Sequence, residues 1–196
     1  MQTHPPSRWT LALRSLAIVA MASLAGCASR SPVEAPPAPL ALEALMGRWH
    51  VIAHVPNFAE RGHVASTVTY TPGADGRIDV LYSAREGFDE PVETRRAVAE
   101  VEPGSGNRLW KIRYYRVIPT RLRILEVAPD GAWALLQYPE RDLAWIFARS
   151  PDVSGAQYRE LEGRIAAHGV NTDKLRRVPQ VRAQVGRLGF APPRRP

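Results

Sequence analysis

The sequence predicts an all-β protein, an eight-stranded antiparallel up-and-down β-barrel with one C-terminal α-helix packed outside it. Between about residues 49 and 149, short runs with alternating apolar side chains recur between turn signals. After residue 149 the apolar spacing becomes that of a helix. Consecutive strands followed by a single helix cannot build a doubly wound parallel sheet, whereas closure into a barrel removes the exposed edges of the sheet.

Turn signals divide the strand region into eight segments. Asp75-Gly76 and Asp130-Gly131 are hairpin dipeptides, and Pro139-Glu140 marks a further turn. Each segment between such turns is enriched in β-branched or aromatic residues, which favours strands. The predicted strands are residues 49–55, 64–70, 77–83, 91–101, 109–115, 122–127, 133–137 and 143–149.

The helical segment has a start signal, an apolar stripe and a stop signal. Ser154 and Gln157 have the spacing of a capping box at the N-terminus of a helix. Gly169 supplies a C-terminal stop. Between them one face is apolar, which predicts a helix of three or four turns packed on the barrel through Tyr158, Leu161 and Ile165.

The N-terminal region has the pattern of an export signal. An apolar run from about residue 15 to 24 follows two arginines and is too short to span a bilayer. It ends in Leu24-Ala25-Gly26-Cys27, which contains the only cysteine. This ending resembles the lipobox of bacterial lipoproteins, which implies that residues 1–26 are a signal peptide and that Cys27 becomes the lipid-bearing N-terminus. The alternative is a free cysteine after an ordinary signal.

Composition divides the remaining chain into three parts. Residues 27–40 contain four prolines and predict an extended tether. Residues 41–180 have the size of one domain. Residues 181–196 are rich in arginine, and we expect a solvated, disordered tail or, alternatively, a tail that contacts anionic lipid.

The formal net charge of +7 does not predict a nucleic-acid partner. Residues 41–180 hold 19 basic and 18 acidic side chains, so the excess positive charge lies at the two ends of the chain. A nucleic-acid-binding face needs a cluster of phosphate contacts within the domain.

Three segments of the predicted barrel resemble bacterial lipocalins. Residues 47–53 (Gly-Arg-Trp-His-Val-Ile-Ala) are similar to the family's G-x-W-Y-x-I-A start, and residues 58–62 (Phe-Ala-Glu-Arg-Gly) to its F-E-R-G segment. Residues 138–149 are similar to its P-x-R-x-Y-L-W-I-L-S-R ending, so that the resemblance spans about residues 42–180. It implies that Arg149 packs over Trp49 beside Gly47 and closes one end of the barrel. A guanidinium over an indole face contributes about 0.5–2 kcal/mol.

Strand alternation assigns the side chains that face the barrel interior. The same side chains fit two roles, since an eight-stranded barrel is either filled by its core or holds one small ligand. The resemblance to lipocalins favours the ligand cavity. The predicted ligand-binding residues are Val68, Tyr70, Val80, Tyr82, Trp110, Ile112, Tyr114, Leu122, Ile124, Leu143, Trp145 and Phe147.

The segment between the fifth and sixth strands departs from the family pattern. It contains three arginines where relatives are often rich in aromatic residues and glycine. In an up-and-down barrel this turn lies at the end opposite the closed one. We expect Arg116 and Arg121 to meet an anionic head group there; the alternative is that they keep a loop soluble.

Catalytic and metal-binding patterns are weak. His50 and His54 are predicted to share a strand face but to lie roughly 13 Å apart, too far to chelate one metal. All four histidines after Cys27 are given ordinary surface roles, and the acidic residues 86–93 are expected to be solvated loop charges. The sequence contains no G-x-S-x-G, P-loop or dinucleotide fingerprint. We therefore expect a binding protein without metal or cofactor rather than an enzyme.

The resemblance implies a function in the bacterial envelope. Ala28 follows Cys27 where inner-membrane lipoproteins carry aspartate, which implies anchoring in the outer membrane, facing the periplasm. The implied activity is binding, storage or transport of a fatty acid or lysophospholipid. Two alternatives remain: a lipocalin-type isomerase, which needs an inward titratable group, and a structural lipoprotein with a filled barrel. No pattern in the sequence assigns an oligomeric state.

Overall fold

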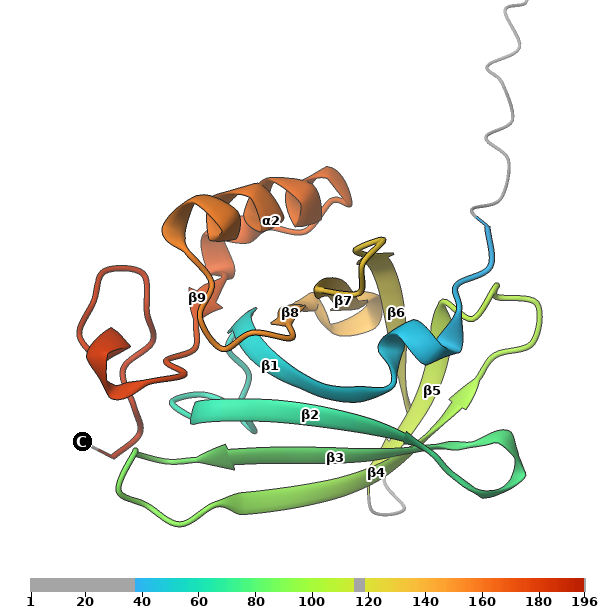
Figure 1. Ribbon diagram of the computed structural model, residues 1–196, viewed down its shortest axis with the longest axis horizontal. Helices are drawn as coiled ribbons and strands as arrows, with labels where there is room; N and C mark the ends of the chain where they lie inside the picture. Colours follow the sequence, from blue (N-terminus) through green and yellow to red (C-terminus); the bar gives the residue numbers. More distant parts are fainter. Residues whose placement is uncertain (1–37, 115–118, 196) are drawn as a thin grey trace, which may run out of the picture. The chain divides into compact units, whose positions relative to one another are not determined.

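The computed structural model describes residues 38–114 and 119–195, and in this part of the chain eight antiparallel strands close into a barrel (Figure 1). A short 3-10 helix η2 (Leu42–Leu45) precedes them. The strands are β1 (Gly47–His54), β2 (Val64–Pro72), β3 (Ile78–Arg85), β4 (Glu93–Val101), β5 (Leu109–Tyr114), β6 (Thr120–Val127), β7 (Trp133–Tyr138) and β8 (Leu143–Ala148). The predicted fold class is confirmed, and each strand overlaps its predicted range.

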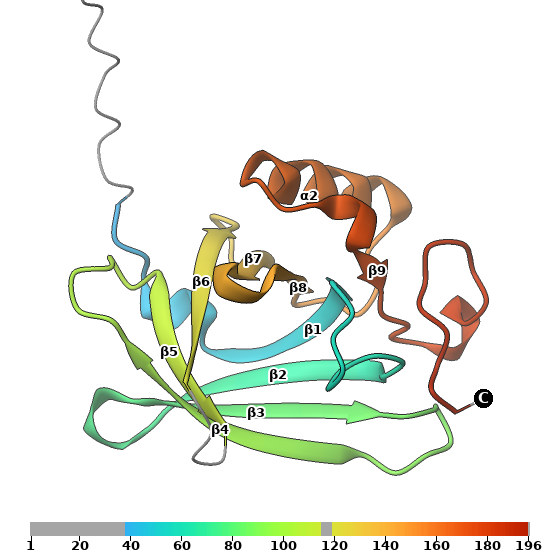
Figure 2. The same cartoon turned by 180° about the vertical axis from the view of Figure 1, so that it is seen from behind.

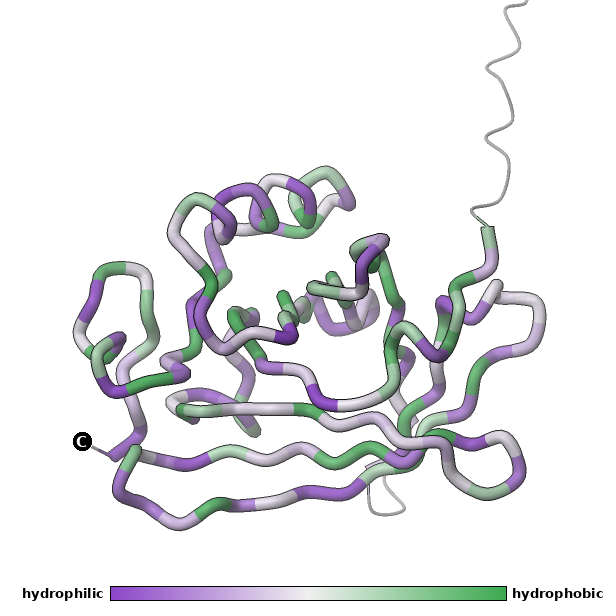
Figure 3. The backbone as a smooth tube through the Cα atoms, viewed as in Figure 1, coloured by the Kyte–Doolittle hydropathy of each residue, from purple (hydrophilic) through white to green (hydrophobic). Residues whose placement is uncertain are grey.

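Closure comes from β1, which pairs on one edge with β2 and on the other with β8. The hairpin between β2 and β3 has the predicted turn residues. Asp75 and Gly76 both have positive φ (56° and 70°), the left-handed conformation that a tight hairpin between β2 and β3 requires. Inward and outward side chains alternate along each strand, and in β3 the inward ones are buried and the others more exposed. Hydropathy varies along the strands (Figure 3), but β8 is apolar on both faces because its outward face packs beneath the helix.

Helix α2 (Gly155–Ala167) covers the outside of the barrel at β1, β7 and β8, as predicted (Figure 2). Its N-cap is Ser154, whose side-chain oxygen accepts a hydrogen bond from the backbone of Gln157 (3.1 Å). Leu161 and Ile165 are buried in a second apolar core between the helix and the barrel wall. The protein therefore has one core inside the barrel and another beneath the helix.

One end of the barrel, called the base here, is closed by the predicted pair. The guanidinium carbon of Arg149 lies 3.5 Å from the centre of the Trp49 ring, and Trp49 Nε1 donates to the carbonyl of Leu45 (2.8 Å). Gly47 has a φ of +89°, and a Cβ there would lie 3.4 Å from Arg149. Arg149 also donates to the carbonyl oxygens of Ala44, Met46 and Arg48. The predicted geometry of the base is confirmed.

A short ninth strand, missed in the sequence, fills the gap where β1 and β2 separate. Strand β9 (Arg176–Arg177) pairs with the end of β1. Just beyond it, the Gln180 side chain donates to the carbonyls of Val51 (2.8 Å) and Ser66 (3.4 Å) and so bridges β1 and β2. The Gln180 amide thus takes the place of backbone hydrogen bonds between β1 and β2. An apolar side chain could not, because it has no donor for the backbone carbonyls.

The expectation of a disordered tail is wrong for residues 181–195. This segment runs past the turn between β3 and β4 (Figures 1 and 2), and its backbone donates from Arg194 to Gly62 (2.7 Å) and from Arg195 to Glu86 (2.8 Å). The Glu86 carboxylate pairs with both arginines. Asp89 and Glu90 likewise pair with Arg182 and Arg195, so three of the acidic residues expected to be solvated have arginine partners on the C-terminal segment.

Several predictions concern residues outside the described ranges. These are the signal peptide 1–26, Cys27 with most of the tether, and Arg116. Within the described ranges, α2 and the 3-10 helices are all too short or too polar to cross a bilayer.

Candidate ligand-binding site

The predicted inward residues face one interior, as strand alternation requires. All twelve belong to the apolar core inside the barrel; Tyr114 and Leu143 are partly buried and the other ten are buried. The core divides by depth. Near the base, Trp110 is fully buried and meets the Tyr70 ring edge-on, with ring centres 5.2 Å apart. Trp110 and Ile124 line neither of the cavities described below, so their predicted ligand contact has no support, whereas the other ten line at least one of them.

The end opposite the base, called the mouth here, contains a pocket of about 420 Å³. Below it, within the barrel, the remaining space is only about 30 Å³. The first volume is within the range of small-molecule sites and the second is roughly that of one water molecule. The mouth pocket is lined by Asn57, Phe58, Ala59, Glu60, Tyr82, Arg95, Tyr114, Thr120, Tyr138, Arg141, Leu143 and Trp145.

Glu60 is the charged group at the floor of the mouth pocket, and it also lines the inner cavity. Its Oε2 accepts hydrogen bonds from Trp145 Nε1 (2.8 Å) and lies 3.0 Å from His54 Nδ1. Asn57 fixes the backbone of the loop, because its side-chain oxygen accepts from the amides of Ala59 and Glu60. Burial by itself raises the pKa of Glu60, but the hydrogen bonds and the nearby imidazole outweigh it, so that its pKa is lowered. The carboxylate is therefore ionised at neutral pH.

A β-bulge places His54 beside Glu60. The pairing of β1 with β8 shifts register between Val51 and Ala53, so that His54 is opposite the inward residue Trp145. The prediction that His50 and His54 share a strand face is wrong, because one extra residue reverses the alternation. His50 instead contacts the Gln180 side chain outside the barrel core (3.1 Å).

A second polar group lies beside the pocket. His63 Nδ1 lies 2.8 Å from the hydroxyl of Tyr82, which donates to the Ser66 hydroxyl (3.3 Å). His63 and Ser66 are each 2% exposed, so the expected surface role is wrong for His63, as it is for the equally buried His54. Burial lowers the pKa of His63, and the positive charge of Arg194 lowers it further. His63 is therefore neutral at neutral pH.

Four tyrosines are among the residues that line the inner cavity: Tyr70, Tyr82, Tyr114 and Tyr138. Burial raises the pKa of all four, and the charge of Glu60 adds to this; for Tyr114 the pKa rises to about 12. These hydroxyls therefore remain protonated and able to donate hydrogen bonds. The centre of the barrel thus has the ionised Glu60, paired with His54, beside protonated tyrosine side chains.

Of the two arginines predicted at the mouth, Arg116 lies outside the described residues and Arg121 is described. Arg121 lies on the outward side of β6, pairs with Glu102 (2.9 Å) and does not line the mouth pocket. It lines a neighbouring hollow of about 460 Å³ that shares Thr120, Tyr138 and Arg141 with that pocket, so its contact with a head group stays a prediction. Its strand parity is opposite to that of Leu122, which faces inward. Arg95 and Arg141 line the mouth pocket instead. Arg95 donates to the carbonyl of Ala59 (2.8 Å), which leaves Arg141 at the exposed rim.

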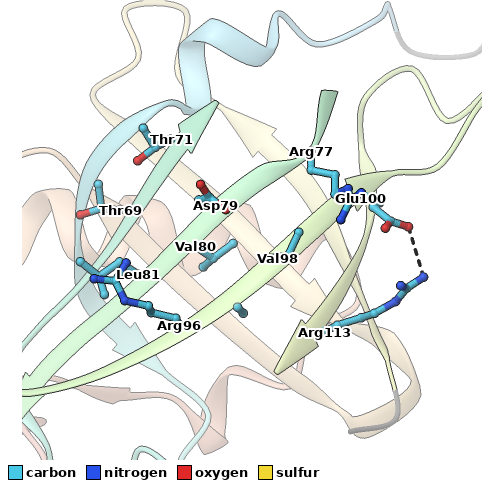
Figure 4. Close-up of a pocket in the computed structure, with 11 residues that line it drawn as sticks. Thr69, Thr71, Arg77, Asp79, Val80, Leu81, Arg96, Val98, Glu100 and Arg113 are labelled. Atoms are coloured by element: carbon cyan, nitrogen blue, oxygen red, sulfur yellow. Dashed lines mark hydrogen bonds and ion pairs between the residues drawn. The ribbon is translucent and has the colours of Figure 1, made fainter. Parts of the chain in front are cut away.

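A larger hollow of about 740 Å³ lies outside the barrel on β2–β5 (Figure 4). Its polar wall mixes both signs of charge, including an Arg113–Glu100 pair at 3.2 Å. Most of its lining residues are on the outward face of the strands, and Val80 and Ala97 of the inner core also contribute to it. Among the described residues, no group of three or more His, Cys, Asp or Glu side chains is placed to hold a metal ion.

A barrel closed at its base and hollowed at its mouth defines the class of calyx-shaped binding proteins. A family model described as a lipocalin-like domain matches residues 40–180, and the chain belongs to this family, which binds small hydrophobic ligands.

Relatives and solved structures agree with this assignment. Temperature-induced lipocalin-1 of Arabidopsis thaliana is 30% identical over 155 residues, covering 72% of this chain and 80% of the relative. Outer membrane lipoprotein Blc of Escherichia coli K12 is 24% identical over 133 residues, covering 66% and 73%. Insecticyanin from the tobacco hornworm Manduca sexta has a similar fold, with a TM-score of 0.59, 19% identity and coverage of 76% and 85%.

Proposed function

We propose that this protein is a membrane-anchored lipocalin that binds and carries an amphiphile with a long apolar chain, such as a fatty acid or lysophospholipid, in the bacterial envelope. The mouth pocket of about 420 Å³ carries this proposal. Its walls include Phe58, Leu143 and Trp145, which supply apolar contact. Phe58 is 95% exposed, so a bound chain would cover apolar surface that water now contacts. Such burial contributes about 25 cal/mol per Å².

The depth of binding follows from the small inner cavity. With about 30 Å³ below the pocket, the barrel core has no room for a long chain. The ligand would therefore occupy the mouth and extend toward the rim, unless Tyr138 and Trp145 change rotamer. The filled lower barrel supports the alternative of a structural lipoprotein only if the mouth pocket binds nothing.

Binding is testable through the pocket's own tryptophan. Trp145 lines the mouth pocket, whereas Trp133 lies on the helix side of the wall. Titration with dodecanoate, dodecylamine or lysophosphatidylethanolamine should change the intrinsic fluorescence of the wild type and of Trp133→Phe. Absence of saturable binding by every amphiphile tested would overturn the proposal and favour the structural alternative.

The anchor is supported by the lipobox-like ending at Cys27 and by the relative named as an outer membrane lipoprotein. We expect the wild type to carry acyl chains on Cys27 and to sediment with outer membranes. Cys27→Ser should be unacylated and released from the membrane fraction. Mass spectrometry of the mature N-terminus decides this, because a wild-type chain without acyl groups would contradict the anchor.

An enzymatic alternative has one specific observation in its favour. It requires an inward titratable group, and the His54–Glu60 pair at 3.0 Å supplies one beside the pocket. An imidazole next to a fixed carboxylate can move a proton to or from a bound ligand. Incubation of lipid with the wild type and with His54→Gln, followed by mass spectrometry and chromatography for isomers, distinguishes the two: a carrier returns its ligand unchanged.

A further inference from the structure

We propose that Glu60 determines ligand specificity by binding a hydrogen-bond-donating end of the amphiphile, an ammonium or a hydroxyl, at the floor of the mouth pocket. This inference rests on the proposed binding function and gives the ligand an orientation. The polar end enters first, and the apolar chain extends along the pocket wall toward the rim. This orientation is opposite to the one expected from the sequence, in which an anionic head group stays at the rim.

The position of Glu60 is the first step of the argument. It is the carboxylate shared by the mouth pocket and the inner cavity, and its side chain is 18% exposed. A ligand that fills the pocket therefore reaches it. In contrast, Glu140 lies at the outer rim with a side chain 52% exposed and within 3.9 Å of Arg121.

The hydrogen bonds of Glu60 are the second step. Both the Trp145 indole and the His54 imidazole contact Oε2, which fixes the carboxylate in one orientation. The Asn57 side chain also stabilises the ionised carboxylate and helps to lower its pKa, but none of the hydrogen bonds among the described residues is made to Oε1. A carboxylate oxygen accepts two hydrogen bonds, and Oε1 is not one of the buried polar atoms that lack a partner, so it is open to solvent in the pocket. A ligand donor can therefore replace water at an acceptor that Trp145 and His54 already hold in one orientation.

The surrounding charge is the third step. The lowered pKa of Glu60 keeps the acceptor negative, and the nearby tyrosine hydroxyls are neutral. Arg95 also lines the pocket, and its guanidinium donates to the carbonyl of Ala59 and lies 4.0 Å from the Glu93 carboxylate. A carboxylate ligand placed there would meet like charge, whereas an ammonium would gain a charge-assisted hydrogen bond.

The test compares three ligands of equal chain length at neutral pH: dodecylamine, dodecanol and dodecanoate, each below its critical micelle concentration. Affinity is measured by tryptophan fluorescence and by calorimetry. A hydrogen bond to a charged group contributes about 1.5–3 kcal/mol, which corresponds to roughly 10- to 150-fold in affinity. We expect dodecylamine to bind at least tenfold more tightly than dodecanoate, with dodecanol between them.

The variant Glu60→Gln keeps the shape of the side chain and removes its charge. We expect it to lose the preference for dodecylamine over dodecanoate while binding dodecanol within about threefold of the wild type. Glu140→Gln is the matched control and should keep the wild-type order. Circular dichroism checks that both variants fold; if Glu60→Gln does not, the wild-type ligand series still decides the inference.

The outcomes separate this inference from the proposed function. If the three ligands bind the wild type equally, or dodecanoate binds most tightly, specificity through Glu60 is wrong and apolar binding at the mouth remains. A folded Glu60→Gln that keeps the tenfold preference also overturns it. If none of the three binds, the proposed function itself fails.

Discussion

The base and the mouth are built from the same eight strands, yet they differ in nearly every physical property. At the base, two tryptophans with no exposed surface fill the interior, and one arginine closes it through three backbone carbonyls. At the mouth, tyrosines and a partly buried carboxylate line a pocket of about 420 Å³, and two buried histidines contact those lining residues. The comparison teaches that strand parity decides which side chains face inward, while side-chain size and polarity decide whether that interior is core or site.

The largest expected effect is at the base. Trp49→Ala removes a fully buried indole together with its contact to Arg149 and its hydrogen bond to Leu45. Such large-to-small substitutions cost about 3–5 kcal/mol. We expect a loss of this size in the free energy of unfolding, measured by urea denaturation with circular dichroism. A loss below about 1 kcal/mol would mean that the base does not hold the barrel together.

The contact between the two residues has its own test. Arg149→Ala should cost less than Trp49→Ala, and the double variant should lose less than the sum of the single losses because the residues touch. A double-mutant cycle measures this coupling. Strict additivity would contradict the packing of Arg149 on the indole.

The next effect is at the mouth, where ligand affinity should change but the free energy of unfolding should not. Phe58→Ser alters a side chain that is 95% exposed, so the free energy of unfolding should stay within about 0.5 kcal/mol of the wild type. Affinity for a long-chain amphiphile should fall several-fold, because the phenyl ring lines the pocket. Leu188→Ser is the matched control, since Leu188 is fully exposed and lines neither the mouth pocket nor the inner cavity. Equal affinities for the two variants would exclude Phe58 from the site.

The smallest effect is a pH dependence at the mouth. Burial, followed by the charge of Arg194, lowers the pKa of His63 below its ordinary value of 6.5. Between the two pKa values the unfolded chain binds a proton that the native protein does not, so the free energy of unfolding decreases as pH falls below 6.5. In His63→Gln, the free energy of unfolding measured by urea denaturation should depend less on pH between pH 6.5 and 5 than it does in the wild type. His50, whose pKa is also lowered by burial, should leave a residual slope. An unchanged slope in His63→Gln would contradict a buried neutral imidazole.

The sequence predicted the strands, the helix cap and the base because these depend on local periodicity and on two short motifs. It did not predict the side of the strand on which His54 lies, because a one-residue bulge has no signature in alternation. The order of residues 181–195 also escaped prediction, since it depends on ion pairs such as Arg194–Glu86 between segments far apart in the chain.

The sequence predicted which strand residues face the site, but it did not predict the role of Glu60 or the volume of the pocket. Parity identified Tyr82, Tyr114 and Trp145, but it carries no information on how much volume those rings leave free. Glu60 lies in the segment 58–62, whose sequence indicates the family but not the environment of the carboxylate. A charged residue between a strand end and a glycine was the available signal. Its burial by Trp145, 85 residues away, depends on the closed barrel.

The division of the barrel into a structural base and a binding mouth is tested most directly by contact quenching. An amphiphile with bromine atoms in its chain, added at saturation, should quench Trp145 in the mouth pocket and leave Trp110 near the base unaffected. We therefore predict that quenching is largely lost in Trp145→Phe and retained in Trp110→Phe. Retained quenching in Trp145→Phe together with its loss in Trp110→Phe would show that the ligand binds at the base and would contradict this division.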